Sequence, residues 1–142
     1  MRHFAPSLGG IPMQLSRLLP LWAVVIAGCA AAVTTVDGRR LRLSDPDFPA
    51  YVEGVFRNQN QVATDLGFAL DDAPTDSPQA MRLSAAEDAL LAACADLNEI
   101  ATLRRDERRA GLKLKLETAK SAPRCEAATL DAKRALDSVG AH

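Results

Sequence analysis

Cysteine is the residue type in this chain whose side chain most plainly could do chemistry. There are three, Cys29, Cys94 and Cys125, and a thiol can pair in a disulfide, act as a nucleophile or carry a covalent group. Cys94 and Cys125 lie too far apart in the sequence to form a CxxC redox motif. The odd number matters, because an exported protein must account for the cysteine that is left unpaired.

The first of these cysteines follows a short apolar segment. Residues 18–28 are apolar apart from Pro20, and Arg17 comes just before them. A bilayer-spanning helix needs about 20 apolar residues, whereas a run of roughly 10–14 residues is typical of the core of a signal peptide. The small residues Ala27 and Gly28 would let a peptidase approach the backbone. The pattern therefore predicts a signal peptide over residues 1–28. Translation could also start at Met13, which would give a shorter signal peptide.

The four residues Ile26-Ala27-Gly28-Cys29 resemble the lipobox of bacterial lipoproteins. The resemblance implies that the Cys29 thiol receives a diacylglyceryl group, that cleavage occurs before Cys29, and that the new amino terminus is acylated, for example with palmitate. Two or more acyl chains give stable membrane anchoring. The alternatives are a short uncleaved anchor or an ordinary signal peptide. In Gram-negative members of the class, Ala30 in place of aspartate implies the outer membrane, with the protein facing the periplasm.

The remaining residue types point away from catalysis. The mature chain implied by the lipobox has one histidine, His142, which is the last residue, so histidine-assisted nucleophiles and histidine metal sites are not expected. The sequence has no glycine-rich phosphate loop and no pattern of alternating aromatic and basic residues. The carboxylate pairs, such as Asp71-Asp72, fall in loop or exposed settings. We expect no enzyme activity, no metal, no cofactor other than the covalent lipid, and no nucleic-acid partner.

The elements that position these residues begin with a tether over residues 29–43. Two strand-like pieces flank Asp37-Gly38, which is a favoured two-residue hairpin turn. The tether is therefore expected to be a short hairpin that rests on the domain or an extended leash. At about 3.3 Å per residue, an extended leash would reach roughly 46 Å. A helical domain is expected over residues 44–142.

The first helix is predicted over residues 46–71, where apolar residues recur at alternating intervals of four and three. Gln59 falls on this apolar seam, so it should either fix the helix register or lie where the bundle is open to another chain. The four aromatic residues of this region are expected to fill the core. An alternative is a partner-binding groove at Tyr51 and Phe56. The aromatic set is Phe48, Tyr51, Phe56 and Phe68.

The second helix is predicted over residues 84–109, after a loop at 71–82 and a capping box that starts at Ser84. Its end is ambiguous: Gly111 or Pro123 could stop it, and residues 112–116 could form a strand. If Cys29 carries lipid, Cys94 and Cys125 are an even pair, and a turn at Gly111 places them opposite each other. We therefore predict a Cys94–Cys125 disulfide and a third helix over residues 112–139 that contains Pro123.

Charge is divided unevenly along the predicted mature chain. Residues 30–99 carry a net charge of −7 and residues 100–142 a net charge of +4. Six basic residues gather at the predicted turn between the second and third helices, where they are either solvated or form a patch for an anionic partner. These residues are Arg104, Arg105, Arg108, Arg109, Lys113 and Lys115.

Together these features predict an all-α protein: a small antiparallel three-helix bundle with a disulfide-linked helical hairpin, preceded by a signal peptide and a short tether. In size and layout it is similar to the small helical pilotin lipoproteins, which carry secretin subunits to the outer membrane. The resemblance implies a non-enzymatic module that binds or escorts another envelope protein. The alternative is a structural or cell-wall-associated lipoprotein that contacts anionic polymer or lipid head groups through the basic turn.

Overall fold

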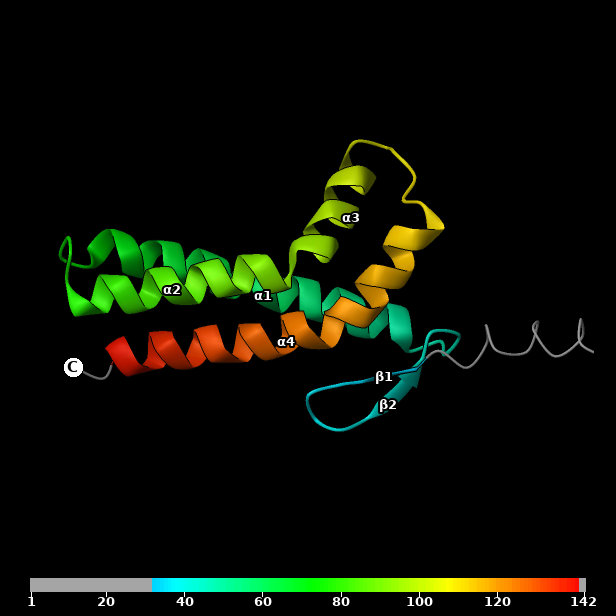
Figure 1. The fold of residues 1–142 in the computed structure, drawn as a ribbon, viewed down its shortest axis with the longest axis horizontal. Coiled ribbons are helices and arrows are strands. Elements are labelled where there is room, and N and C mark those ends of the chain that lie inside the picture. Colours follow the sequence, from blue (N-terminus) through cyan, green and yellow to red (C-terminus); the bar gives the residue numbers. More distant parts are fainter. Residues whose placement is uncertain (1–31, 141–142) are drawn as a thin grey trace, which may run out of the picture. The chain divides into compact units, whose positions relative to one another are not determined.

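The computed structural model describes residues 32–140. The predicted signal peptide, the lipobox and Cys29 lie outside these residues. The described chain forms a two-stranded hairpin followed by four helices (Figure 1). In chain order these elements are β1 (Ala32–Thr34), β2 (Arg40–Arg42), α1 (Phe48–Asp72), α2 (Pro78–Ala93), α3 (Ala95–Arg105) and α4 (Leu112–Gly140).

The hairpin closes through a longer loop than the sequence predicts. The Thr35 N–H donates to the Arg39 carbonyl at 2.9 Å, and the Gly38 N–H donates to the Thr35 carbonyl at 3.0 Å. The loop therefore has three residues instead of the predicted two. Gly38 has a φ of +84°, which a residue without a Cβ adopts at little cost.

This hairpin rests on the helical domain. Val33 and Leu41 face each other across the two strands, and each is only 8% exposed. The Val36 N–H donates to the Glu126 carboxylate of α4 at 3.0 Å. Of the two expected forms of the tether, the structure has the packed hairpin, and the extended leash is wrong for residues 32–43.

Helix α1 begins two residues later than predicted. The Asp45 carboxylate accepts the Arg42 N–H at 2.7 Å, and the Asp45 carbonyl accepts the Phe48 N–H at 3.1 Å, so a turn precedes the helix. Pro49 then lies in the first turn of α1, where a missing N–H leaves no bond unmade. The predicted seam is confirmed, because four of its residues are buried: Val55, Gln59, Val62 and Leu66.

The second predicted helix is two helices in the structure. Helix α2 begins at Pro78, because the Ser77 side chain accepts the Ala80 N–H at 3.0 Å and caps the helix in the standard way. The capping box predicted at Ser84 is therefore wrong. At Cys94 the backbone leaves helical geometry, with φ −98° and ψ 5°, and α3 departs in a new direction (Figure 1).

Helix α4 bends to match this change of direction. Figure 1 shows the bend in the orange part of the helix, which contains Pro123. Proline lacks the N–H that would bond to the carbonyl four residues earlier, and its ring presses against that carbonyl, so it bends a helix. Helix α3 packs on the early turns of α4 and follows them. We call α3 together with residues 112–122 the arm.

The turn between α3 and α4 lies where the sequence predicts it, but a residue other than the expected Gly111 ends the helix. Helix α3 ends at Arg105, and Glu107 has a left-handed φ of +57°. The Arg108 N–H donates to the Leu103 carbonyl at 2.7 Å, and the Glu107 N–H donates to the Arg104 carbonyl at 3.1 Å. This is a Schellman ending in which glutamate takes the place usually held by glycine. Residues 112–116 are helical, so the alternative strand is wrong.

The core lies between α1, α2 and α4. Leu66, Leu83 and Leu90 are fully buried at its centre. The expected all-α, antiparallel bundle is confirmed at the level of a helical, disulfide-linked fold, but with four helices in place of three and a small sheet. Between residues 32 and 140, none of the helices has both the length and the apolar character needed to cross a bilayer.

Candidate functional site

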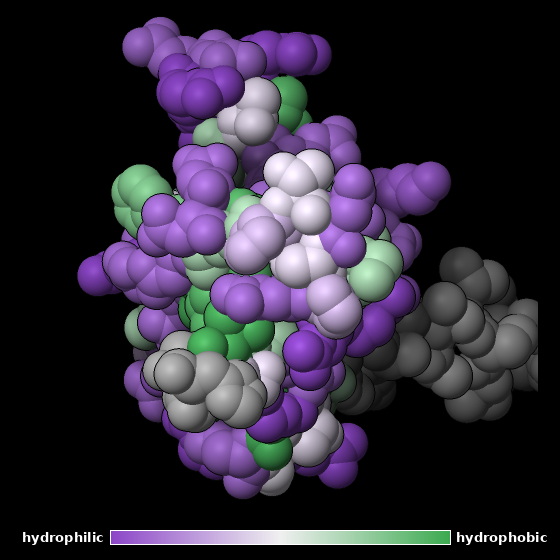
Figure 2. Space-filling view, turned by 90° about the vertical axis from the view of Figure 1, so that its left-hand side faces the viewer, coloured by the Kyte–Doolittle hydropathy of each residue, from purple (hydrophilic) through white to green (hydrophobic). Residues whose placement is uncertain are grey.

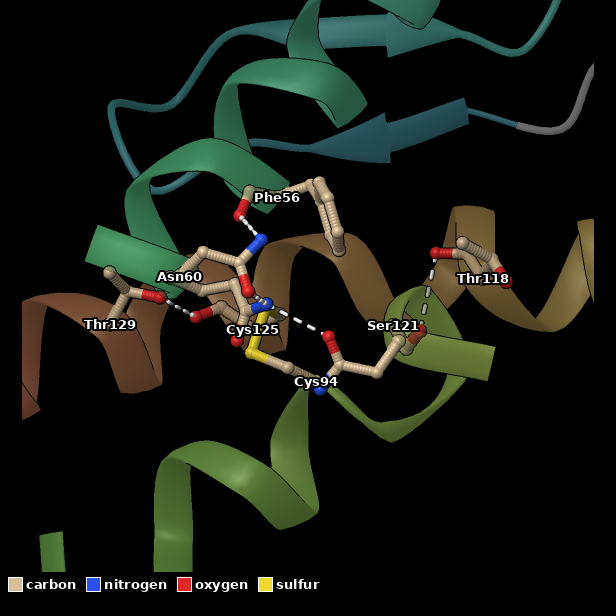
Figure 3. Close-up of a disulfide and its surroundings, with 9 residues drawn as sticks. Phe56, Asn60, Cys94, Thr118, Ser121, Cys125 and Thr129 are labelled. Atoms are coloured by element: carbon tan, nitrogen blue, oxygen red, sulfur yellow. Dashed lines mark hydrogen bonds between the residues drawn. A yellow bond between two sulfur atoms is a disulfide. The ribbon is translucent and has the colours of Figure 1, made fainter. Parts of the chain in front are cut away.

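The Cys94–Cys125 disulfide (Figure 3) joins the junction of α2 and α3 to the bent part of α4. The two Cα atoms are 4.7 Å apart, and both cysteines are fully buried. Cys94 is the residue at which α2 gives way to α3, and Cys125 lies two residues after the proline in α4. The predicted pairing is confirmed, and the bridge fixes the base of the arm to the bundle.

Because the arm leans away from the bundle, it leaves a groove along the first half of α1. The groove has a volume of about 540 Å³. Its floor and walls are mainly apolar, with Val52 and Phe56 from α1 facing Ile100 from α3. We call this feature the arm groove. Its lining residues are Phe48, Pro49, Val52, Glu53, Phe56, Leu97, Ile100, Ala101, Arg104, Lys115, Thr118 and Ala119.

The rim of the arm groove is positively charged. Arg104 from α3 and Lys115 from α4 both line it and are exposed. The single carboxylate in the lining, Glu53, accepts a hydrogen bond from the Arg57 guanidinium at 3.1 Å. An incoming group would therefore meet apolar side chains flanked by two cations whose charge Glu53 does not offset.

Of the two residues predicted to line a partner groove, one does so. Phe56 lines the arm groove, whereas Tyr51 donates a hydrogen bond at 2.9 Å to the Glu126 carboxylate on α4. Burial first, and then this hydrogen bond, raise the pKa of Tyr51 well above its ordinary value of 10.0. The expectation that all four aromatic residues fill the core is wrong for Phe68, which is 66% exposed.

Gln59 joins α1 to the base of the arm. Its side chain is only 1% exposed, and its amide N–H donates to the Asn98 side-chain oxygen at 2.8 Å and to that of Asn60 at 3.0 Å. This supports the first of its two predicted roles, fixing the register of α1 against a neighbour. Within residues 32–140, no buried side-chain nitrogen or oxygen lacks a hydrogen-bond partner.

The six basic residues predicted to cluster do so around the loop from α3 to α4. Figure 2 shows hydrophilic surface at the top of the molecule, where this loop lies. All six are exposed. Of these six, only Arg105 forms an ion pair with another of the described residues, Asp106, at 3.6 Å. We call this set the basic tip: Arg104, Arg105, Arg108, Arg109, Lys113 and Lys115.

Two further hollows have a more polar character than the arm groove. One, of about 700 Å³, runs between α1 and α4 and contains Asp65, Lys133 and Asp137. The other, of about 460 Å³, is lined by Phe56 and Gln59 of α1 and by Asn98 of α3, among others. Across the part of the chain that the structure describes, no three His, Cys, Asp or Glu side chains come together in a way that could hold a metal ion.

No protein-family model, curated protein or solved structure matches this chain. Its function therefore has to be inferred from the geometry of the domain itself. The arm groove is the feature with the clearest binding character, and sequence reasoning found only part of it. Leu97 and Ile100 have the three-residue spacing of an amphipathic helix within the predicted second helix, and nothing in this periodicity indicates that the helix bends there.

Proposed function

We propose that this protein is an envelope lipoprotein, anchored through acyl chains on Cys29, whose helical domain is a non-enzymatic binding or assembly module of the pilotin type. The lipobox supports the anchor and the compartment, which in a Gram-negative organism is the periplasmic face of the outer membrane. The single observation that carries the binding role is the arm groove, because an apolar channel beside an aromatic-bearing helix suits a docking segment.

The chemistry of the groove indicates what the segment is. Val52, Phe56 and Ile100 would receive an apolar helix face, in the manner of other helix-in-groove complexes. Arg104 and Lys115 at the rim would attract carboxylates beside that face. We therefore propose an amphipathic helix of another envelope protein, with acidic residues flanking its apolar stripe.

Photo-crosslinking in the native cell tests this proposal. The photoreactive amino acid p-benzoylphenylalanine replaces Phe48 in the arm groove, and in a second strain replaces Phe68, which lies on the same helix but outside the groove. We expect a discrete protein adduct from position 48 alone, and we expect the peptide attached there to be amphipathic and acidic. Arg104→Glu should weaken the adduct at least several-fold without affecting folding, because Arg104 is exposed.

Two outcomes would overturn the docking role. One is the absence of any adduct at position 48, and the other is the same set of adducts at positions 48 and 68. The anchor is tested separately by the intact mass of the membrane-extracted protein. A mass that includes the acyl groups and is lost in Cys29→Ala supports it, whereas an unmodified mass contradicts it.

A second candidate function is a cell-wall-associated lipoprotein that contacts anionic polymer through the basic tip. The observation in its favour is that the tip is exposed and that most of its charge is not offset by ion pairs. It predicts salt-sensitive binding to isolated cell wall. Charge reversal at Arg108 and Arg109 should abolish that binding while leaving the Phe48 adduct intact.

A further inference from the structure

The folded hairpin places the start of the described chain firmly on the domain. Ala32 opens β1, which pairs with β2 and packs on α4. Only residues 30 and 31 lie between Ala32 and the proposed lipidated Cys29. At about 3.3 Å per residue, the three steps from Cys29 to Ala32 reach roughly 10 Å, far less than the 46 Å of an extended leash.

The basic tip and the start of the described chain lie at the same end of this domain. In Figure 1, β1, the first turn of α1 and the loop from α3 to α4 share one end of the helices. The loop between α1 and α2 lies at the other end. A lipid attached just before Ala32 would therefore hold the end that carries the basic tip close to the bilayer.

The composition of this end suits an anionic, partly apolar surface. Leu112 is 74% exposed and Leu116 is 37% exposed, and both lie on the first turns of α4 among the basic side chains. Lys113 and Lys115 lie near the positive end of the α4 dipole, where cations do not stabilise their own helix. The α4 dipole therefore does not account for these two lysines, and both are exposed and available to an external anion.

We propose that the basic tip binds the anionic phospholipid head groups of the membrane in which the protein is anchored, with Leu112 inserted at the interface. This inference rests on the proposed anchor at Cys29. Attraction of Lys and Arg to anionic head groups decays over a Debye length, about 8 Å at physiological salt. The short link holds Ala32 within roughly 10 Å of the lipidated residue, and the basic tip lies at the same end of the helices (Figure 1), so the arm groove would open towards the membrane.

The test uses the full lipidated protein reconstituted into vesicles of phosphatidylcholine, with or without phosphatidylglycerol. An environment-sensitive fluorescent amino acid replaces Leu112, or replaces Met81 as a matched control. Met81 is 62% exposed and lies near the start of α2, at the opposite end of the helices. Brominated lipids in the vesicles quench a fluorophore that reaches the interface.

We expect at least twofold quenching at position 112 in vesicles with phosphatidylglycerol, little in vesicles without it, and none at position 81. The substitutions Arg108→Glu, Arg109→Glu and Lys113→Glu together should remove the effect, as should high salt. These three side chains are exposed, and circular dichroism would verify that the variant is folded.

Failure of this inference differs from failure of the anchor. A lipidated protein whose probe at position 112 is not quenched overturns the tip contact alone. Equal quenching without phosphatidylglycerol overturns the role of anionic head groups. A response to isolated cell-wall polymer but not to vesicles would assign the tip to the polymer instead. An intact mass without acyl groups overturns both the anchor and the membrane contact that depends on it.

Discussion

At the scale of single residues, Glu126 joins three parts of the fold. Its carboxylate, on α4, accepts the Val36 N–H of the hairpin at 3.0 Å and the Tyr51 hydroxyl of α1 at 2.9 Å. Each bond crosses between elements that are far apart in the sequence. Hydrogen bonds to a charged group are stronger than bonds between neutral groups. Glu126 therefore helps to fix the hairpin, and with it the point at which the proposed anchor begins.

The first prediction concerns Tyr51, which is the only tyrosine in the chain. Burial and the hydrogen bond to Glu126 raise its pKa above 10.0, so the folded protein should show no phenolate absorbance at pH 10, where a free tyrosine is about half ionised. Because the pKa is higher in the folded state than in the unfolded state, this contribution to stability is complete below pH 10 and falls as the pH rises above it.

The control for this titration is Glu126→Gln. The neutral amide removes the charge that opposes phenolate formation, so Tyr51 should ionise at a lower pH than in the parent protein. Ultraviolet absorbance followed against pH, with circular dichroism at each point, measures ionisation and folding together. Ionisation near pH 10 in parent protein that is still folded would show that the Tyr51–Glu126 contact does not hold in solution.

At the scale of elements, the end of α3 carries the second prediction. Glu107 has a left-handed φ of +57°, which costs a residue with a Cβ roughly 1–2 kcal/mol. Glu107→Gly should therefore stabilise the domain by about 1 kcal/mol, because glycine is the usual residue at this position of a Schellman ending. A gain of this size should raise the melting temperature by roughly 4 °C in a domain of this length.

Glu107→Gln is the matched control, since it removes the same charge but keeps the Cβ. We expect its melting temperature to stay close to that of the parent protein. If both variants are stabilised equally, the gain comes from relief of charge at this position and not from the backbone. If neither is stabilised, the left-handed ending is not a source of strain.

The seams of the helices could be predicted from sequence because burial imposes a regular spacing. In α4, the side chains of Thr118, Ser121, Cys125 and Ala132 recur at the spacing of one helix face, and all four are buried. The pairing of Cys94 with Cys125 could be predicted because both lie nearly equally far along the chain from the predicted turn at Gly111. Two antiparallel helices that meet at a turn bring such residues together. A glycine was expected to make that turn, and glutamate makes it.

The bend of the arm could not be predicted in this way. It depends on a break between α2 and α3 at Cys94 and on a bend in α4 near Pro123, which lie side by side in the fold. Taken alone, a cysteine predicts no helix break, and one proline predicts only a local kink. A proline inside a helix indicates a kink, but no residue pattern indicates that α3 follows this kink and leaves the side of α1 open. Val52 and Ile100 accordingly had the pattern of core residues, although they line a groove.

At the scale of the whole molecule, the length of the link before Ala32 would decide how the domain meets the membrane in the anchored form that we propose. With the hairpin folded onto α4, about 10 Å of free chain remains after the proposed acylated cysteine. If Cys29 is lipidated as proposed, so short a link would give the basic tip a high effective concentration at the lipid surface. Avidity of this kind falls steeply with linker length once the link exceeds the distance that it must span.

The last prediction follows from that dependence. Inserting 20 flexible Gly/Ser residues between Ala31 and Ala32 should lower the effective concentration of the tip roughly 20-fold, by the −3/2 power of link length. Quenching of the Leu112 probe by brominated anionic lipids should fall accordingly. The melting temperature should not change, because the insertion precedes β1 and breaks none of the contacts of the hairpin or the helices.

The same insertion placed at Thr75, in the exposed loop between α1 and α2, is the control, since it adds equal length without moving the anchor. Quenching at Leu112 should then match that of the parent protein. If the insertion before Ala32 also leaves quenching unchanged, the charge of the tip is sufficient for membrane contact and the short link is not required. If both insertions reduce quenching equally, added bulk is responsible, and the membrane-facing orientation derived from the hairpin is wrong.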